Sequence, residues 1–165
     1  MSKEIISQSV NETIGLGKLL ASICRGGEVF TLDGELGAGK THLTKGIGMQ
    51  LGCSEVVHSP TFTLINEYPS PQFWLYHADF YRLNSENDVM GLGLDEYVDS
   101  NGIVVIEWAN KFPSVLPEQR IELNFRVLPD DSRLIIIELY GDNFQDIKKW
   151  LSDLPEKILM KELLV

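Results

Sequence analysis

Residues 34–41 read Gly34-Glu35-Leu36-Gly37-Ala38-Gly39-Lys40-Thr41, which is a glycine, four residues and then Gly-Lys-Thr. This spacing is the P-loop pattern of proteins that bind nucleoside triphosphates. Its glycines let the backbone turn tightly enough for consecutive N–H groups to face one anion. The pattern therefore predicts a phosphate-binding loop, with Lys40 as the cation that faces the phosphates and the Thr41 hydroxyl as a Mg²⁺ ligand.

The segments on both sides of this loop also fit a P-loop. Residues 28–32 are rich in strand formers, and residues 40–51 predict a helix that ends at Gly52. Such a helix adds its positive N-terminal end to the phosphate site. Gly46 and Gly48 lie inside this helix, and each destabilises it by roughly 1 kcal/mol relative to alanine. Close packing on the sheet would explain why they are present. A glycine-rich loop without a ligand is the alternative, which the fit of both flanks disfavours.

The composition limits the class of protein. With 165 residues, 44% of them hydrophobic, we expect a single domain over residues 1–165. The chain shows no signal peptide and no run of about 20 apolar residues, and its two cysteines lack metal-site spacing, so we expect a cytoplasmic protein with no membrane contact. A net charge of −10 argues against direct binding of nucleic acid, so a partner would have to bind any RNA that is involved.

Hydrophobic periodicity predicts the remaining elements. Ser9 and Glu12 predict a capping box for a helix that ends before Gly26. A continuous apolar run at 103–106 predicts a buried, central parallel strand. The other expected elements are antiparallel hairpins at 64–79 and 121–140, a short helix opened by Ser85, a helix at 144–154 and one or two helical turns after Pro155. Together these predict an α/β fold.

Two acids follow strand-like runs and are candidates for the second half of the site. Asp79 closes the run at 73–79, and Glu107 follows the run at 103–106. Ligands of open α/β sheets gather at the carboxyl ends of the strands. Either carboxylate could therefore bind Mg²⁺, directly or through water, or orient the attacking water. The sequence leaves both assignments open.

The sequence partly indicates which nucleotide is bound. Guanine-specific P-loop proteins carry Asn/Thr-Lys-x-Asp, and the nearest match here, Asn110-Lys111-Phe112-Pro113, lacks the aspartate that would pair with the base. We therefore expect ATP. Arg82 is a candidate arginine finger, although an arginine after an aromatic run is as often the ion-pair partner of an acid.

Five pieces of sequence together resemble the bacterial TsaE (YjeE) family, ATPases of tRNA threonylcarbamoyladenosine synthesis. Their order and spacing agree with that family over about residues 9–128. They are the P-loop, Ser59-Pro60-Thr61-Phe62-Thr63-Leu64, His77-Ala78-Asp79-Phe80-Tyr81-Arg82-Leu83, Gly93-Leu94-Asp95-Glu96-Tyr97 and Ile106-Glu107-Trp108. The resemblance implies a P-loop NTPase fold with a central parallel sheet flanked by antiparallel strands, and Mg²⁺-dependent hydrolysis of ATP.

The resemblance also implies roles for particular residues. Thr41 and Glu107 would hold the metal, and Asp79 would serve its water shell or the catalytic water. Trp108 resembles a tryptophan beside the site, and residues 59–63 resemble a switch-like loop near the γ-phosphate. Thr13 resembles the residue near the adenine, whereas the sequence alone favours a surface threonine. The implied catalytic residues are Lys40, Asp79 and Glu107, and the implied nucleotide-binding residues are Thr13, Leu36, Gly37, Ala38, Gly39, Lys40, Thr41, His42 and Trp108.

His42 departs from the pattern, because the family commonly has a threonine there that can contact the α-phosphate. A ring nitrogen of His42 could replace that contact or turn away from it. His58 reads as a surface residue rather than a ligand. For His77, core packing and support of the site are equally good interpretations.

The resemblance implies partners as well. The TsaE family works with the TsaD–TsaB pair, which modifies the adenosine beside the anticodon, and its ATP turnover is thought to reset that machine. Contact with tRNA would then be indirect, which fits the acidic composition. Two other functions remain compatible with the P-loop: a small-molecule kinase, which would need an acceptor pocket and a basic lid, and a nucleotide-gated binding module with little chemistry.

Overall fold

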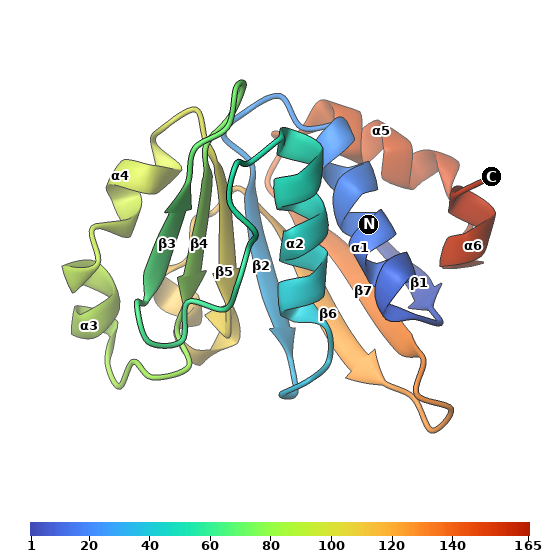
Figure 1. Cartoon of the computed structure of the whole chain (residues 1–165), viewed down its shortest axis with the longest axis horizontal. Coiled ribbons are helices and arrows are strands. Elements are labelled where there is room, and N and C mark those ends of the chain that lie inside the picture. Colours follow the sequence, from blue (N-terminus) through green and yellow to red (C-terminus); the bar gives the residue numbers. More distant parts are fainter.

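The computed structural model describes residues 1–165 and places eight strands in one sheet (Figure 1). The strands are β1 (Ser2–Ser7), β2 (Val29–Gly34), β3 (Ile65–Tyr68), β4 (Leu75–Asp79), β5 (Ile103–Glu107), β6 (Arg120–Val127), β7 (Arg133–Tyr140) and β8 (Lys157–Leu159). The α-helices are α1 (Val10–Ser22), α2 (Lys40–Leu51), α3 (Glu86–Gly91), α4 (Leu94–Val98), α5 (Gln145–Asp153) and α6 (Met160–Leu163).

The strand order is β3-β4-β5-β2-β6-β7-β1-β8. Its centre is parallel, since β4, β5, β2 and β6 all run in one direction. On one side β3 pairs antiparallel with β4, and on the other β7 pairs antiparallel with both β6 and β1. The predicted α/β fold, with a central parallel sheet flanked by antiparallel strands, is confirmed.

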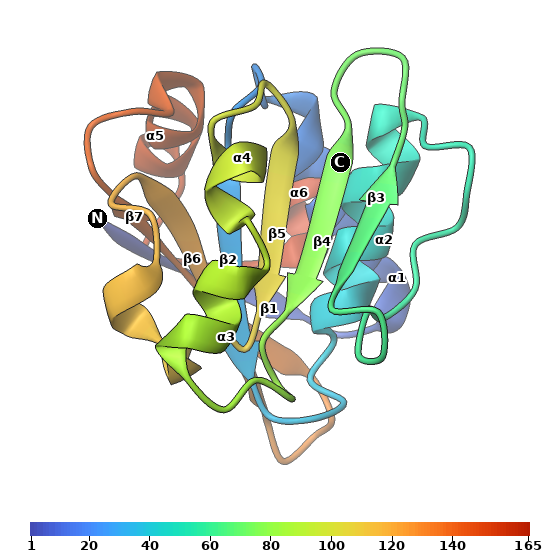
Figure 2. The same ribbon diagram turned by 90° about the vertical axis from the view of Figure 1, so that its left-hand side faces the viewer.

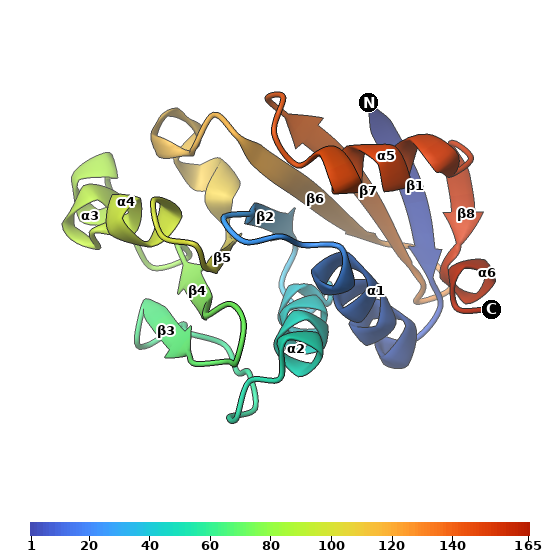
Figure 3. The ribbon, with the colours of Figure 1, turned by 90° about the horizontal axis from the view of Figure 1, so that it is seen from above.

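The central strands are apolar because helices cover both of their faces. Every residue of β5 is buried, as expected for a strand in the middle of a parallel sheet. Figure 2 shows α3 and α4 over one face, and Figure 3 shows α1 and α2 side by side against the other. The core on the α1–α2 side contains 25 buried residues, compared with nine on the α3–α4 side, so α1 and α2 cover the main core.

Helices α1 and α2 approach each other closely enough that two glycines are required. A Cβ atom on Gly46 would lie 2.0 Å from the carbonyl oxygen of Ile14, and one on Gly17 would lie 2.1 Å from that of Leu43. The expectation that Gly46 packs on the sheet is therefore wrong, because it faces α1. Gly48 instead faces Val57, whose Cγ2 would lie 2.6 Å from an added Cβ.

We expect Gly46→Ala to destabilise the protein by about 2 kcal/mol or more, because the added methyl group meets backbone of α1 that has no room to move aside. Urea unfolding followed by circular dichroism measures this as a lower midpoint. Gly91→Ala is the control, since nothing lies within 4 Å of a Cβ at that helical position. Equal midpoints for the two variants would contradict the close contact.

The two ends of the chain differ from the sequence-based expectation. The first residues form β1, which was not predicted, and it pairs with β7. Residues 157–159, expected to be helical, form β8 beside β1, and only the short α6 follows. β1 would otherwise expose its unpaired edge, and three residues of β8 cover it.

No helix of the chain combines the length and the apolar character needed to cross a membrane.

Candidate functional site: a phosphate-binding loop with two carboxylates

The P-loop connects the end of β2 to the start of α2, at the edge of the sheet where β4 and β5 also end. Gly37 (φ 78°) and Gly39 (φ 107°) have positive φ angles, which only glycine adopts without strain. The helix begins directly at Lys40 and ends at Gly52, as the sequence predicts. Its first backbone N–H groups therefore open into the site.

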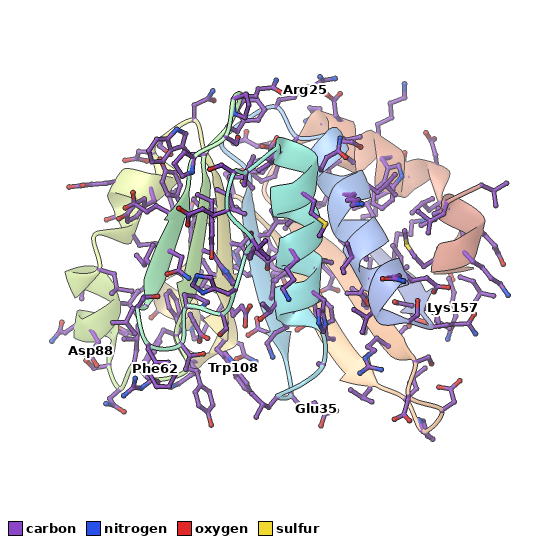
Figure 4. All side chains as sticks on the ribbon, viewed as in Figure 1. Arg25, Glu35, Phe62, Asp88, Trp108 and Lys157 are labelled. Carbon is purple, nitrogen blue, oxygen red and sulfur yellow. The ribbon has the colours of Figure 1, made fainter.

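A cavity of about 330 Å³ lies over this loop. It brings together every predicted site residue except Thr13. Figure 4 shows Glu35 and Trp108 at this end of the molecule, together with Phe62 of the loop before β3 and far from Arg25. The residues that line the cavity are Leu36, Gly37, Ala38, Gly39, Lys40, Thr41, His42, Ser59, Thr61, Asp79, Tyr81, Glu107 and Trp108.

The two candidate carboxylates lie side by side. Asp79 ends β4 and Glu107 ends β5, and they are direct partners in the parallel register. Glu107 Oε1 accepts hydrogen bonds from Thr41 Oγ1 and from His77 Nε2, both at 2.9 Å. Asp79 Oδ1 accepts from the Tyr81 N–H at 2.8 Å, and its Oδ2 accepts from Thr61 Oγ1 at 3.4 Å.

These different partners shift the pKa values of the two acids in opposite directions. Burial tends to raise the pKa of Glu107, but the hydrogen bonds from His77 and Thr41 and the charge of Lys40 outweigh burial and lower it. The pKa of Asp79 is raised, chiefly by burial and further by the charge of Glu107. The site thus holds one acid whose pKa is lowered and one whose pKa is raised.

Lys40 lies between the P-loop and Trp108. Its Nζ donates to the carbonyl oxygens of Gly34 (2.5 Å) and Glu35 (3.1 Å) and lies 4.3 Å from the centroid of the Trp108 ring. Burial lowers the pKa of Lys40, and the surrounding carboxylates partly offset this shift. A cation in this position can reach an anion on the loop without leaving the cavity.

An aromatic pair forms one wall of the site. Trp108 has a positive φ of 58°, an uncommon conformation for a tryptophan, and its ring lies 5.0 Å from that of Tyr81. The tryptophan directly follows Glu107, so this conformation places the ring beside Lys40 while Glu107 stays at the strand end. The sequence predicted Trp108 at the site, and Tyr81 was not expected there.

The loop before β3 reaches the cavity through Ser59 and Thr61, whose hydroxyl oxygens lie 2.7 Å apart. The neighbouring Phe62 is 87% exposed. The guanidinium of Arg82 lies 5.2 Å from the centre of the Phe62 ring, outside the cavity lining, and it forms no ion pair with an acid. Neither of the two interpretations of Arg82 therefore describes its position in this structure.

Thr13 is buried, so the surface interpretation is wrong. Its Oγ1 lies 2.7 Å from Ser7 Oγ, and its Cγ2 would be 3.6 Å from a Cβ on Gly39. Thr13 thus lies beside Gly39 of the P-loop and does not line the cavity. His42 does line the cavity, and burial lowers its pKa, as do the charges of Lys45 and Arg133.

The two remaining histidines lie in different environments. His58 is exposed, with its ring 3.4 Å from the Ser59 carbonyl oxygen, as the surface interpretation expects. His77 is fully buried, and it contacts Glu107 from the neighbouring strand. Of its two interpretations, the contact favours support of the site.

Two charged residues beside the site were missed. Asp33, near the end of β2, is buried and accepts a hydrogen bond from the Asn110 N–H at 2.9 Å, and burial raises its pKa. Arg133 Nη2 donates to the Gly37 carbonyl oxygen at 3.5 Å. The strand-end rule that selected Asp79 would also select Asp33, whereas nothing local in the sequence places Arg133 near the P-loop.

Comparisons with known proteins agree with this geometry. Residues 7–135 match the family model described as "Threonylcarbamoyl adenosine biosynthesis protein TsaE". The chain is 40% identical to the TsaE protein of Bacillus subtilis over 152 residues, which are 91% of this chain and 95% of that protein. It is 39% identical to the TsaE protein of Treponema pallidum, over 80% of this chain and 97% of that one. The crystal structure of Bacillus subtilis YdiB superposes with a TM-score of 0.79 at 34% identity, covering 92% of this chain and 95% of that chain.

Proposed function

Because the chain belongs to the TsaE family of tRNA threonylcarbamoyladenosine biosynthesis, we propose that it is the ATP-hydrolysing component of that modification pathway. Residues 1–165 would act as one P-loop ATPase domain. The observation that carries the proposal is the cavity in which the P-loop, Lys40 and two adjacent carboxylates meet at the strand ends.

We propose that the P-loop backbone and Lys40 bind the phosphates of ATP. Consecutive N–H groups of the loop and the start of α2 supply donors, and Lys40 supplies a full positive charge within the cavity. Residues 110–113 are the nearest match to the guanine-recognition motif, but their lysine is already engaged. Lys111 Nζ donates to the carbonyl oxygens of Tyr81 (2.6 Å) and Leu83 (2.8 Å). ATP therefore remains the expected nucleotide.

The residues at the strand ends fit Mg²⁺. No group of three or more His, Cys, Asp or Glu side chains is arranged to hold a metal, whereas Mg²⁺ commonly takes one or two protein oxygens together with phosphates and waters. Thr41 and Glu107 would hold it, and the Thr41 hydroxyl can keep donating to Glu107 while its lone pairs face the ion. When bound, Mg²⁺ would supply positive charge that neutralises the negative charge developing on the phosphates.

Asp79 would then orient the attacking water. Its Oδ2 has only the 3.4 Å contact from Thr61, so this oxygen is the less engaged of its two. Its raised pKa makes it a better proton acceptor than an exposed aspartate. In this proposal, Glu107 serves the metal and Asp79 serves the water.

The proposed partners are TsaD and TsaB, with tRNA contacted only through them. A chain with a net charge of −10 is poorly suited to bind RNA alone. ATP turnover would reset the TsaD–TsaB complex between rounds of modification rather than drive the transfer chemistry.

We expect steady-state ATP hydrolysis by the purified chain to be slow and to rise at least about tenfold when the TsaD–TsaB pair is added with Mg²⁺, because the exposed loops at the cavity can be ordered by a partner. Release of phosphate measures the rate. Fast turnover without partners would count against partner dependence. ADP formation that requires a small-molecule acceptor would favour a kinase, and ATP binding without hydrolysis under any partner would favour a binding module.

A further inference from the structure

His77 is a buried titratable side chain at the site that the proposed chemistry does not use. It lies in the middle of β4 and is fully buried, on the same face of the strand as Asp79. Its Nε2 lies 2.9 Å from Glu107 Oε1. Because a carboxylate offers only acceptors, Nε2 must carry the hydrogen of this bond.

Three elements thus converge on a single oxygen atom. Thr41 from the start of α2 and His77 from β4 both donate to Oε1 of Glu107, which ends β5. The other oxygen, Oε2, accepts no hydrogen bond from the protein and is not among the buried polar atoms without a partner, so it is open to the cavity that Glu107 lines. The arrangement fixes the direction of the carboxylate.

The remaining ring nitrogen shows that packing alone does not account for this histidine. His77 Nδ1 is buried without a hydrogen-bond partner, one of only two such side-chain atoms in the chain. A buried polar atom without a partner destabilises a folded protein, and an apolar side chain of similar size would avoid it. This unfavourable nitrogen belongs to the same ring that donates to Glu107, so the contact with Glu107, and not packing, accounts for a histidine at this position.

We infer that His77 is a positioning residue, whose Nε2–H holds Glu107 so that Oε1 faces Thr41 and Oε2 faces the nucleotide cavity. This role rests on the proposed function, in which Glu107 serves Mg²⁺ and Thr41 is its neighbour. Groups that orient a metal-binding side chain commonly change metal affinity or activity by about 10- to 100-fold when removed. His77 would act in this way without touching ATP.

The test compares His77→Leu, which lacks the donor, with His77→Gln, whose side-chain amide can donate to the same oxygen. Thr31→Val is the matched control, because it removes the other buried polar atom without a partner, in β2 and outside the cavity. Calorimetry measures ATP affinity with and without Mg²⁺, phosphate release with the TsaD–TsaB pair gives kcat and KM, and thermal unfolding reports the fold.

For His77→Leu we expect a melting temperature equal to or above that of the wild type, a roughly tenfold smaller gain in ATP affinity from Mg²⁺, and a kcat lowered about 10- to 100-fold with little change in KM. His77→Gln should recover most of the loss, and Thr31→Val should match the wild type. Unchanged Mg²⁺ dependence and kcat in His77→Leu would overturn the inference, as would equal losses in both variants together with lowered melting temperatures.

A crystal structure of His77→Leu without nucleotide separates this inference from the proposed function. We expect the Glu107 carboxylate to leave its position and lose the 2.9 Å contact with Thr41 Oγ1. This readout requires no ATP binding or hydrolysis. An unmoved Glu107 would refute the positioning role even if the chain proves to be an ATPase. A displaced Glu107 in a chain that hydrolyses no ATP would leave positioning intact and reject the ATPase proposal.

Discussion

Lys40→Ala is expected to weaken ATP binding by about 3 kcal/mol, which corresponds to roughly 100-fold in Kd. The P-loop backbone can still present its N–H groups, but the only lysine or arginine that lines the cavity is lost. Nearby charges make the loss more severe, because the negative charges of Glu107, Asp33 and Asp79 are then no longer offset by Lys40. Calorimetric titration with ATP and Mg²⁺ measures the change.

The variant itself should fold. Lys40 Nζ bonds two carbonyl oxygens of its own loop, and water in the open cavity can replace it there. Lys18→Ala, on the exposed face of α1, removes the same charge far from the loop and should leave Kd unchanged. Unchanged ATP affinity in the Lys40→Ala variant would show that Lys40 does not bind the phosphates. An equal loss of affinity in both variants would show that Lys40 acts only through the net charge of the protein.

Local signals in the sequence were sufficient to predict the central helix and strands. Helix α2 was predicted with both of its ends, because the P-loop starts it and Gly52, with a φ of 77°, stops it. The buried β5 followed from one uninterrupted apolar run. The strand-end rule made Asp79 and Glu107 separate candidates for the site, of which at least one was expected there, and the register makes them direct neighbours.

What the sequence did not predict depends on contacts between distant segments. The hairpin of β6 and β7 was predicted, but its parallel pairing with β2 joins segments about 90 residues apart, and that pairing brings Arg133 to the P-loop. β1 and β8 exist only because they extend the same sheet past β7. The bond between His77 and Glu107 likewise joins two strands, so periodicity along one strand did not distinguish it from packing.

Glu107→Ala tests the division of work between the two carboxylates. We expect hydrolysis in the presence of the TsaD–TsaB pair to fall roughly 100-fold or more, while ATP affinity changes much less, because the proposed function assigns phosphate binding mainly to the P-loop and Lys40. The kinetic signature is a lower kcat at a nearly constant KM, which indicates an interaction used mainly in the transition state. Glu118→Gln, at an exposed position, removes a carboxylate charge elsewhere and should retain wild-type turnover.

Truncation at Glu107 also leaves His77 Nε2–H buried without an acceptor, at a cost of about 1–3 kcal/mol of stability. A loss of turnover could therefore reflect partial unfolding. Glu107→Gln avoids this, because its amide oxygen can still accept from His77 and Thr41 while the charge that would face Mg²⁺ is gone. Low turnover in Glu107→Gln with an unchanged melting temperature would assign the loss to the missing charge. Normal turnover in both variants would transfer the metal role to Asp79, the only other carboxylate that lines the cavity.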